Sequence, residues 1–405
     1  MNLDPAVYDV AVVGGGSAGL AAAVSAARLG ARTILLERYG FLGGMGTASL
    51  VHTFCGLYLQ DDGAEPEFAN PGFASEMAER MIAATGMGPI RMGRVEVLLQ
   101  HPVEFVRIAD ELVFAEKTLT TRFHAEVVSV ERDSHGWSIG LAGRAGVQSI
   151  RAKTLVDASG DAVVADFLQS DVEMTESPRL QRPAYVFGVQ GVRDFDDGMR
   201  LNLAGTIVEG VRNGRLSKSS MGLSFRASGR AREIFGSLDL TGGGDAYDPL
   251  NGGCLSELEM EGRKIASEVV LYLKEISENW REAYVSHWPM RAGVRESRRW
   301  IGDYVLTGHD LLNGRRFDDE IALATWPMEF RETAKGSKLK FPNEGKPAGI
   351  PLRCLMPRGQ TGIFVAGRCI STDHEAQASI RVMGTCFATG EAAGKAAARF
   401  ANATV

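Results

Sequence analysis

Residues 8–37 have the sequence YDVAVVGGGSAGLAAAVSAARLGARTILLE, and this stretch decides the fold. Residues 10–13 form a short apolar run, typical of a strand that is buried on both faces of a parallel sheet. Residues 17–29 are rich in alanine and free of proline, which predicts a helix that ends at Gly30. Residues 33–36 are expected to form a second strand.

The turn between the first strand and the helix contains three glycines in a G-x-G-x-x-G pattern, Gly14, Gly16 and Gly19. The first permits a tight turn, the second lets a pyrophosphate approach the backbone, and the third lets helix and strand pack closely. The helix that starts near Ser17 directs its free N–H groups at phosphates. Glu37 ends the second strand, where a carboxylate can accept hydrogen bonds from a ribose diol. Together these features predict a dinucleotide site; the glycine spacing alone also occurs in purely structural turns.

Length and composition limit the function further. A chain of 405 residues predicts two or three lobes. Its net charge of -6 argues against nucleic-acid binding. The five cysteines are scattered without a CxxC pair, which is typical of reduced thiols and gives no metal site. With no signal-like start and no apolar run of about 18 residues, we expect a cytoplasmic protein without a membrane span.

The residues after Glu37 distinguish between the dinucleotides, because a second glycine pair, Gly43 and Gly44, follows. The stretch LLERYGFLGGMGTAS at residues 35–49 resembles the FAD-dependent oxidoreductases of the glutathione-reductase-like superfamily, and more narrowly the fumarate reductase and succinate dehydrogenase flavoproteins. Two further segments resemble the same superfamily: TLVDASGDAVVA at residues 154–165 and GIFVAGRCISTDHEAQASIRVMGTCFATGEAAGKAA at residues 362–397.

This resemblance implies a bound FAD and a set of residues that contact it. A helix start within residues 382–385 would point at the N1–C2=O edge of the flavin, where its positive end stabilises the anionic reduced form. The predicted contacts, besides Gly14, Gly16, Gly19 and Glu37, are Ser17, Ala18, Arg38, Gly43, Gly44, Met45, Thr47, Val127, Ala158, Ser159, Gly160, Asp161, Gly367, Arg368, Met383, Gly384 and Thr385. The surroundings of His52 do not reproduce the family's covalent attachment motif, so noncovalent FAD is expected.

The expected fold class is α/β: a Rossmann-like FAD-binding domain, made of a parallel sheet with helices, plus an inserted α+β substrate domain. The FAD-binding domain is predicted to combine residues 1–170 and 345–405, and residues 171–344 are predicted to form the substrate domain. Within these parts we expect helices at residues 102–115 and 255–276, a polar surface loop at residues 335–347 and a closing helix at residues 380–401.

Candidate catalytic groups come from two places. The segment RAGVRESRR at residues 291–299 is the densest charge cluster and precedes an apolar, strand-like stretch at residues 300–306. The resemblance implies that it lines the catalytic cavity, with Arg295 and Arg298 as candidates to bind a substrate carboxylate; a solvated face is the alternative. His374 is expected in a loop over the flavin as a proton carrier, or else as a structural histidine. Arg381 is interpreted as either a cofactor contact or a surface residue, and Arg353 as a weaker candidate for the cavity.

The function implied is an FAD-dependent oxidoreductase that transfers a hydride between a small organic substrate and flavin N5. Two alternatives stay open: a monooxygenase that uses NAD(P)H and oxygen, and an FAD-binding subunit of a larger complex. Gly242–Gly244 is interpreted as a loop, so no resident NAD(P)H domain is expected, and NAD(P)H as a transient donor is left open. The electron acceptor and a homo-oligomeric state are left open as well.

Overall fold

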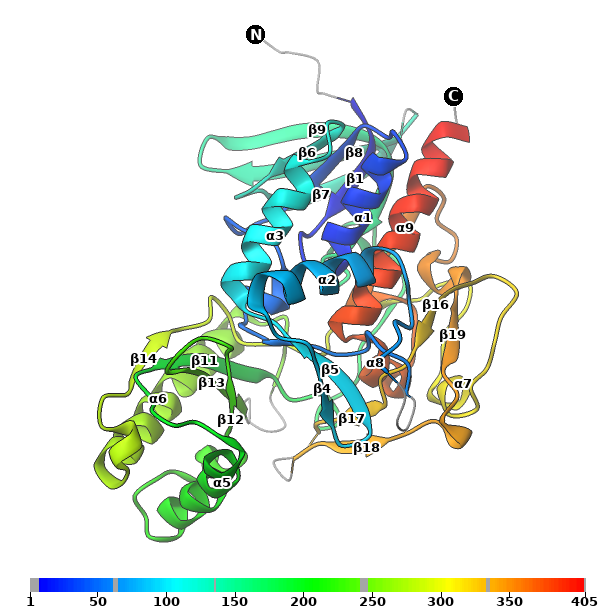
Figure 1. Cartoon of the computed structure of the whole chain (residues 1–405). Helices are drawn as coiled ribbons and strands as arrows, with labels where there is room; N and C mark the ends of the chain where they lie inside the picture. Colours follow the sequence, from blue (N-terminus) through cyan, green and yellow to red (C-terminus); the bar gives the residue numbers. More distant parts are fainter. Residues whose placement is uncertain (1–6, 61–64, 135, 241–246, 333–335, 404–405) are drawn as a thin grey trace.

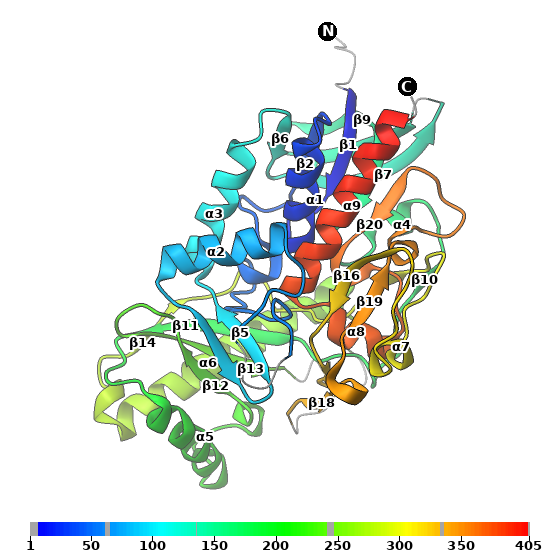
Figure 2. The same ribbon diagram turned by 45° about the vertical axis from the view of Figure 1, so that its right-hand side comes forward.

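A computed structural model of the chain describes residues 7–60, 65–134, 136–240, 247–332 and 336–403. Its largest sheet has the strand order β6-β2-β1-β9-β8-β7, with β20 paired to β9 (Figures 1 and 2). The strands of this sheet are β1 (Val7–Val13), β2 (Thr33–Leu36), β6 (Leu119–Arg122), β7 (Glu126–Asp133), β8 (Gly136–Gly143), β9 (Gly146–Asp157) and β20 (Ile363–Val365).

The central strands of the sheet run parallel. β1 pairs in parallel with both β2 and β9, and β20 pairs in parallel with β9 on its other side. The register sets Val13 opposite Leu36 and Asp157, so the carboxyl ends of these strands meet at one edge. Ligands of such sheets bind outside that edge. The expected Rossmann-like α/β fold is confirmed, and it places the glycine turn after Val13 at the ligand-binding edge.

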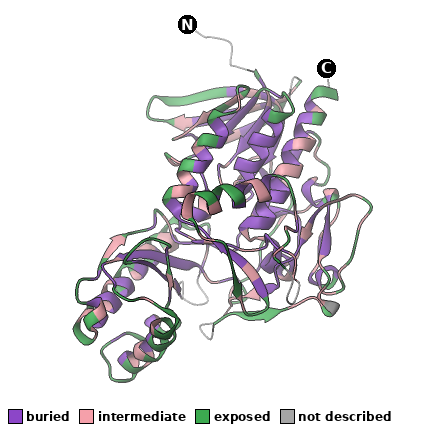
Figure 3. Ribbon diagram, in the orientation of Figure 1, coloured by how far each residue is buried: buried purple, intermediate pink, exposed green. Residues whose placement is uncertain are grey.

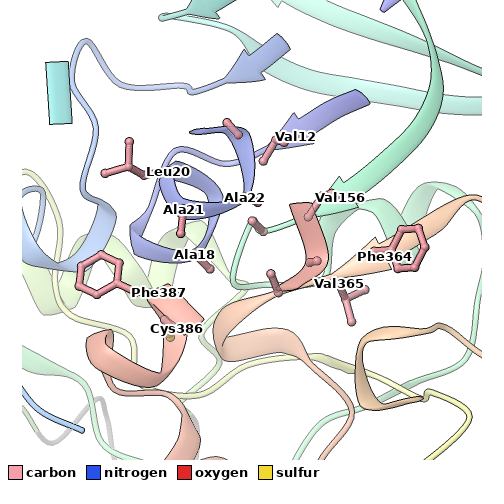
Figure 4. Close-up of a cluster of buried hydrophobic side chains, with 14 of the residues drawn as sticks. Val12, Ala18, Leu20, Ala21, Ala22, Val156, Phe364, Val365, Cys386 and Phe387 are labelled. Atoms are coloured by element: carbon pink, nitrogen blue, oxygen red, sulfur yellow. The ribbon is translucent and has the colours of Figure 1, made fainter. Parts of the chain in front are cut away.

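Two helices from opposite ends of the chain cover one face of this sheet. They are α1 (Ser17–Arg28) and α9 (Met383–Ala403), which lie side by side in Figures 1 and 2. A Cβ atom on Gly390 or Gly394 would overlap the carbonyl oxygen of Ala18 or Ala22, so only glycine permits this backbone approach. Figure 4 shows side chains of both helices gathered in one apolar cluster with β1, β9 and β20. The first core therefore needs both ends of the chain.

A second core lies in the middle of the chain. An antiparallel sheet of order β12-β13-β11-β14 packs against α5 and α6, whose outer faces are exposed (Figure 3). The buried members of this core lie between Leu180 and Ala292. Its elements are β11 (Ala184–Gln190), α5 (Asp197–Arg212), β12 (Ser224–Ala227), β13 (Glu233–Asp239), α6 (Gly252–Ile276) and β14 (Tyr284–His287).

Smaller elements connect the two cores. Most buried hydrophobic side chains between Trp300 and Met328 join the first core, whereas Trp326 packs with Val95 and Val97. The remaining helices are α2 (Phe73–Thr85), α3 (Pro102–Phe114), α4 (Val163–Phe167), α7 (Gly308–Leu312) and α8 (His374–Ile380). The remaining strand pairs are β3 (Thr53–Phe54) and β4 (Pro89–Met92) with β5 (Val95–Leu99), β10 (Val172–Glu173) with β15 (Arg299–Trp300), β16 (Glu320–Ala324) with β19 (Ala348–Pro351), and β17 (Met328–Phe330) with β18 (Lys338–Lys340).

Several local predictions are confirmed and others are wrong. The helices at residues 102–115 and 255–276 correspond to α3 and α6. The helix expected at residues 380–401 corresponds to α9, which begins at Met383 because Ile380 and Arg381 end the preceding helix α8. The strand expected at residues 300–306 stops at Trp300, and the loop expected at residues 335–347 contains β18. Gly242–Gly244 lies outside the described residues. No helix among those described is long and apolar enough to cross a membrane.

Candidate functional site

The glycine turn after β1 is shaped by backbone contacts. Gly14 has a φ of 97°, and a Cβ there would lie 2.7 Å from the Ala158 carbonyl oxygen. A Cβ on Gly19 would overlap the Gly14 carbonyl oxygen. At Gly16, in contrast, a Cβ would meet only the Cα of Gly44, at 3.8 Å. Gly14 and Gly19 are thus required by the fold, whereas the space beside Gly16 stays open for a ligand.

The second glycine pair packs against this turn. The Gly43 N–H donates to the Gly15 carbonyl oxygen at 2.9 Å. Gly43 and Gly44 both have positive φ values, 105° and 55°, and a Cβ on Gly44 would lie 2.7 Å from the Cα of Gly16. The two glycine segments therefore lie backbone against backbone, which extends the concave surface that begins at Gly16.

Glu37 is fixed at the carboxyl end of β2 by two backbone donors. Its Oε2 accepts a hydrogen bond from the Gly15 N–H at 2.7 Å, and its Oε1 accepts one from the Tyr39 N–H at 2.9 Å. The side chain is buried, and this burial raises the pKa of the carboxyl group although both hydrogen bonds oppose the shift. Each oxygen has lone pairs beyond these bonds, so the carboxylate can still accept from a ligand.

The turn after β9 forms the opposite wall. The buried Asp157 carboxylate accepts hydrogen bonds from the Ser159 N–H (3.0 Å), the Val164 N–H (3.2 Å) and the Trp300 indole N–H (2.9 Å). These bonds hold residues 158–163 in a tight turn. Next along it, Asp161 forms an ion pair with Arg368 at 2.8 Å.

One cavity is lined by both of these walls, and about 1080 Å³ of space not filled by atoms lies in it, open solvent included. Its lining includes Glu37, Arg38 and Val127 and also Met45, Arg381 and Met383; this last part, at the start of α9, is called the far end. Concave sites of this kind bind small-molecule ligands and cofactors. An open cradle at Gly16, free helix N–H groups and an acidic side chain along one cavity fit the pyrophosphate and ribose of a dinucleotide.

Most residues predicted to contact FAD line this cavity. They are Gly14, Gly16, Ser17, Ala18, Glu37, Arg38, Gly44, Met45, Val127, Ala158, Ser159, Gly160, Asp161, Gly367, Arg368 and Met383.

Five other predicted contacts lie behind the wall: Gly19, Gly43, Thr47, Gly384 and Thr385. The Thr47 hydroxyl donates to the Leu42 carbonyl oxygen at 2.7 Å. A Cβ on Gly384 would lie 2.6 Å from the backbone of Gly56. The Thr385 hydroxyl is fully buried and has no hydrogen-bond partner among the described residues. Gly19, Gly43, Thr47 and Gly384 thus act in the packing of the wall.

The three catalytic candidates do not line the cavity. The Arg295 guanidinium pairs with Asp239 at 2.7 Å and donates to the Arg182 carbonyl oxygen at 2.6 Å. Arg298 donates to the Asp161 carbonyl oxygen at 3.1 Å and pairs with Asp166 at 2.5 Å. Both arginines are thus satisfied by distant acidic residues, which sequence spacing cannot reveal.

His374 lies at the start of α8 and not in a loop as expected. Its Nδ1 is 3.0 Å from Glu296 Oε1, and its Nε2 is 2.8 Å from Glu332 Oε1. Burial opposes protonation of the ring, but the two carboxylates outweigh it and raise the pKa of His374. The geometry therefore places a buried histidine between two acidic side chains that favour its charged form.

The cavity also contains residues that the sequence did not assign. Tyr39, Ala48, Glu126 and Arg291 line it, and the Tyr39 ring lies beneath the Arg38 guanidinium, 5.0 Å from the ring centroid. Arg291 belongs to the charge cluster at residues 291–299, but nothing in its spacing distinguishes it from Arg295 or Arg298. Arg353, in contrast, is exposed and forms an ion pair with Asp319 at 3.0 Å.

Comparison with known proteins gives a family match and distant structural likenesses. The model of the FAD-dependent oxidoreductase family matches residues 9–405. No curated protein matches the chain. Among solved structures, p-nitrophenol 4-monooxygenase from Pseudomonas putida DLL-E4 has 12% identity and a TM-score of 0.49, with 99% of this chain and 82% of that chain covered.

Two further structures show similar scores. A geranylgeranyl bacteriochlorophyll reductase-like protein from Thermoplasma acidophilum has 12% identity and a TM-score of 0.48, with 98% of this chain and 79% of that chain covered. The anhydrotetracycline hydroxylase OxyS from Streptomyces rimosus has 16% identity and a TM-score of 0.43, with 74% of this chain covered. The matched region spans about half, 54%, of the OxyS chain.

Proposed function

Because the chain belongs to the FAD-dependent oxidoreductase family, we propose that it binds FAD in this cavity, where the flavin exchanges a hydride at N5 with a small organic substrate. The observation that carries the proposal is the lining of the cavity. The same cavity is lined by the Gly16 cradle and by Arg381 and Met383 at the start of α9. One site could thus hold the dinucleotide and, at its far end, the reacting part of the flavin and its substrate.

The residues of the two turns would hold the dinucleotide part. The open space at Gly16 and the first N–H groups of α1 would receive the pyrophosphate, because a helix N-terminus favours negative charge. The fixed carboxylate of Glu37 would accept hydrogen bonds from the ribose. Arg368, oriented by Asp161, adds a positive charge on the opposite wall.

The far end of the cavity carries positive charge. The N-terminus of α9 begins at Met383, and Arg381 lies two residues before it. Helix N-terminal N–H groups and a guanidinium both stabilise negative charge that develops nearby. Arg295, Arg298 and His374 keep a proposed part in catalysis as positioning residues: Arg298 holds the Asp161 carbonyl oxygen, and His374 holds Glu296.

We also propose a branch of the family and a domain organisation for the chain. The sequence resemblance at residues 35–49 and 362–397 supports kinship with the glutathione-reductase-like superfamily and its fumarate reductase flavoproteins. Residues 171–344 are proposed as the substrate domain beside an FAD-binding domain of residues 1–170 and 345–405. The separate core between Leu180 and Ala292 supports an independent second lobe within that segment.

The FAD is proposed to be noncovalent. His52 does not line the cavity; its ring is buried and stacks on Phe235 with centroids 5.0 Å apart. Burial lowers the pKa of His52 to about 3, so the ring is neutral at physiological pH. We expect acid precipitation to release all flavin into the supernatant, and the His52→Ala variant to contain as much FAD as the wild type. Yellow colour retained in the washed pellet would contradict this expectation.

Absorbance of the purified protein tests the proposed function. We expect a yellow protein whose flavin band bleaches under anaerobic conditions on addition of an oxidisable organic substrate and recovers with an electron acceptor. Bleaching by NADH alone, followed by oxygen-dependent product formation, would favour the monooxygenase. A yellow protein that no reductant or substrate bleaches would favour the FAD-binding subunit. A colourless protein that takes up no added FAD would refute the proposal.

A further inference from the structure

Arg291 brings the second lobe to the wall of the cavity. Its side chain belongs to the lining, whereas its neighbour Ala292 is a buried member of the second core. The N–H groups of Met290 and Arg291 both donate to the Ala48 carbonyl oxygen, at 2.7 and 3.3 Å. The backbone of Arg291 is therefore fixed beside Ala48, which also lines the cavity.

This anchoring places Arg291 near the two glycine segments. The Ala48 N–H donates to the Gly44 carbonyl oxygen at 2.7 Å, and Gly44 packs on the Gly16 cradle. Arg291 also interacts electrostatically with Asp161, in the turn after β9 that forms the opposite wall. Arg291 is thus linked to both walls, and the diphosphate is proposed to bind between them.

The Arg291 guanidinium has no hydrogen bond or ion pair among the residues that the structure describes. Two acidic residues, Asp161 and Glu259, interact with it electrostatically, and both pair with other arginines. Asp161 pairs with Arg368 at 2.8 Å, and Glu259 on α6 pairs with Arg263 at 3.7 Å. The half-buried guanidinium can therefore donate to a ligand in the cavity.

The Tyr247 hydroxyl is a second donor at this place. Tyr247 belongs to the second core and is 6% exposed. Burial raises the pKa of its hydroxyl, which therefore stays protonated, and the hydroxyl has no hydrogen-bond partner within the described ranges. The charged residues that interact with it electrostatically are Arg368, Asp161, Arg291 and Arg295, of which the first three line the cavity. A buried hydroxyl without a partner costs free energy until a ligand or water completes its hydrogen bond.

We propose that the second lobe contributes to the cofactor site: Arg291 binds the diphosphate of FAD, and the Tyr247 hydroxyl donates a further hydrogen bond to it. A planar guanidinium presents paired N–H donors that match phosphate oxygens. The first N–H groups of α1 and the side chain of Arg291 would then hold one diphosphate from two lobes. The inference rests on the proposed function, because it adds residues to the same FAD site.

Titration of the full-length apoprotein with ADP and with adenosine tests the inference, because these probes differ only in the diphosphate. We expect wild type to bind ADP more tightly than adenosine. Arg291→Gln should lower this preference about tenfold or more and leave the Kd of adenosine unchanged. Arg291→Lys should lose less, because it retains the charge. An unchanged preference, or equal weakening of both probes, would overturn the inference.

A second variant and a control locate the effect. Tyr247→Phe keeps the ring in the core and should lower the preference for ADP about threefold or more. Arg281→Met is the matched control, because Arg281 lies in the same lobe and pairs with Glu278 at the surface, and it should leave both Kd values unchanged. If Arg291→Gln does not fold, an unchanged preference in Tyr247→Phe would overturn the assignment.

Hydrogen exchange measures the link between the lobes. The amides of Met290 and Arg291 exchange only when their bonds to the Ala48 carbonyl oxygen open. A diphosphate held by both lobes opposes this opening, so ADP should slow their exchange more than adenosine does in wild type, and less so in Arg291→Gln. Equal exchange with both probes in wild type would contradict a role for the second lobe.

These experiments separate the inference from the proposed function. A yellow protein whose affinity for FAD and ADP is the same in wild type, Arg291→Gln and Tyr247→Phe would overturn the inference and leave the proposed function standing. A wild type that takes up no FAD would overturn the proposed function, whatever its affinity for ADP.

Discussion

Substitution of Gly16 separates binding of the cofactor from folding of the protein. Gly16 has a φ of -69°, which any residue adopts, and a Cβ there meets nothing closer than the Gly44 Cα at 3.8 Å. Gly16→Ala should therefore change the free energy of unfolding of the apoprotein by no more than about 0.5 kcal/mol. In Gly16→Val the larger side chain occupies the space proposed for the pyrophosphate. We take the displaced pyrophosphate to lose two charge-assisted hydrogen bonds from the first N–H groups of α1. At about 1.5 kcal/mol or more for each bond, this loss should raise the Kd of FAD about 100-fold or more.

Gly14 provides the contrasting control. Its φ of 97° disfavours any side chain, and a Cβ would lie 2.7 Å from the Ala158 carbonyl oxygen. Gly14→Ala should thus destabilise the apoprotein itself by about 2 kcal/mol or more. Urea unfolding of each apoprotein and fluorescence titration with FAD measure the two effects separately. Stoichiometric FAD in purified Gly16→Val, or equal destabilisation at both positions, would refute the reasoning.

Two further predictions concern stability. The carboxylates of Glu296 and Glu332 raise the pKa of His374 against the effect of burial. The stability that protonated His374 provides is therefore complete below its unfolded pKa of about 6.5. This stability is lost as the pH rises through the pKa of His374 in the folded state. The difference in unfolding free energy between wild type and His374→Gln should accordingly shrink from pH 6 to pH 9; a constant difference would contradict the pairing. Gly394→Val forces α9 away from the Ala22 backbone and should lower the free energy of unfolding by about 3 kcal/mol in thermal melts, unlike Val at the exposed Arg399.

A short stretch of sequence predicts those parts of the site that the backbone of the same stretch forms. Gly14 and Gly19 are required by close backbone contacts within or beside one turn, and Gly16 leaves the space beside the same turn open. The position of Glu37 beside this turn was predictable too, because the end of β2 lies next to the end of β1 in any such sheet. These features were therefore predictable from 30 consecutive residues.

The roles of the arginines were not predictable in the same way. Arg295 and Arg298 share one short segment with Arg291, yet only Arg291 lines the cavity. What distinguishes them is the position of Asp239 on β13 and of Asp166 on α4, acidic residues far away in the chain. Ion pairs between residues far apart in the chain depend on the folded arrangement, and one sequence contains no signal for them. Thr47 shows the same limit on a small scale, because its hydroxyl is used by the Leu42 carbonyl oxygen.

The packing of α1 on α9 has a consequence for biosynthesis. The Gly16 cradle is synthesised well before the wall of the cavity that begins at Arg381. Until α9 is synthesised, Ala18 and Ala22 expose an apolar helix face that Gly390 and Gly394 later cover. The second lobe can fold meanwhile, since its core draws on Leu180 to Ala292 alone. We therefore expect FAD to be fully bound only after α9 has docked on α1.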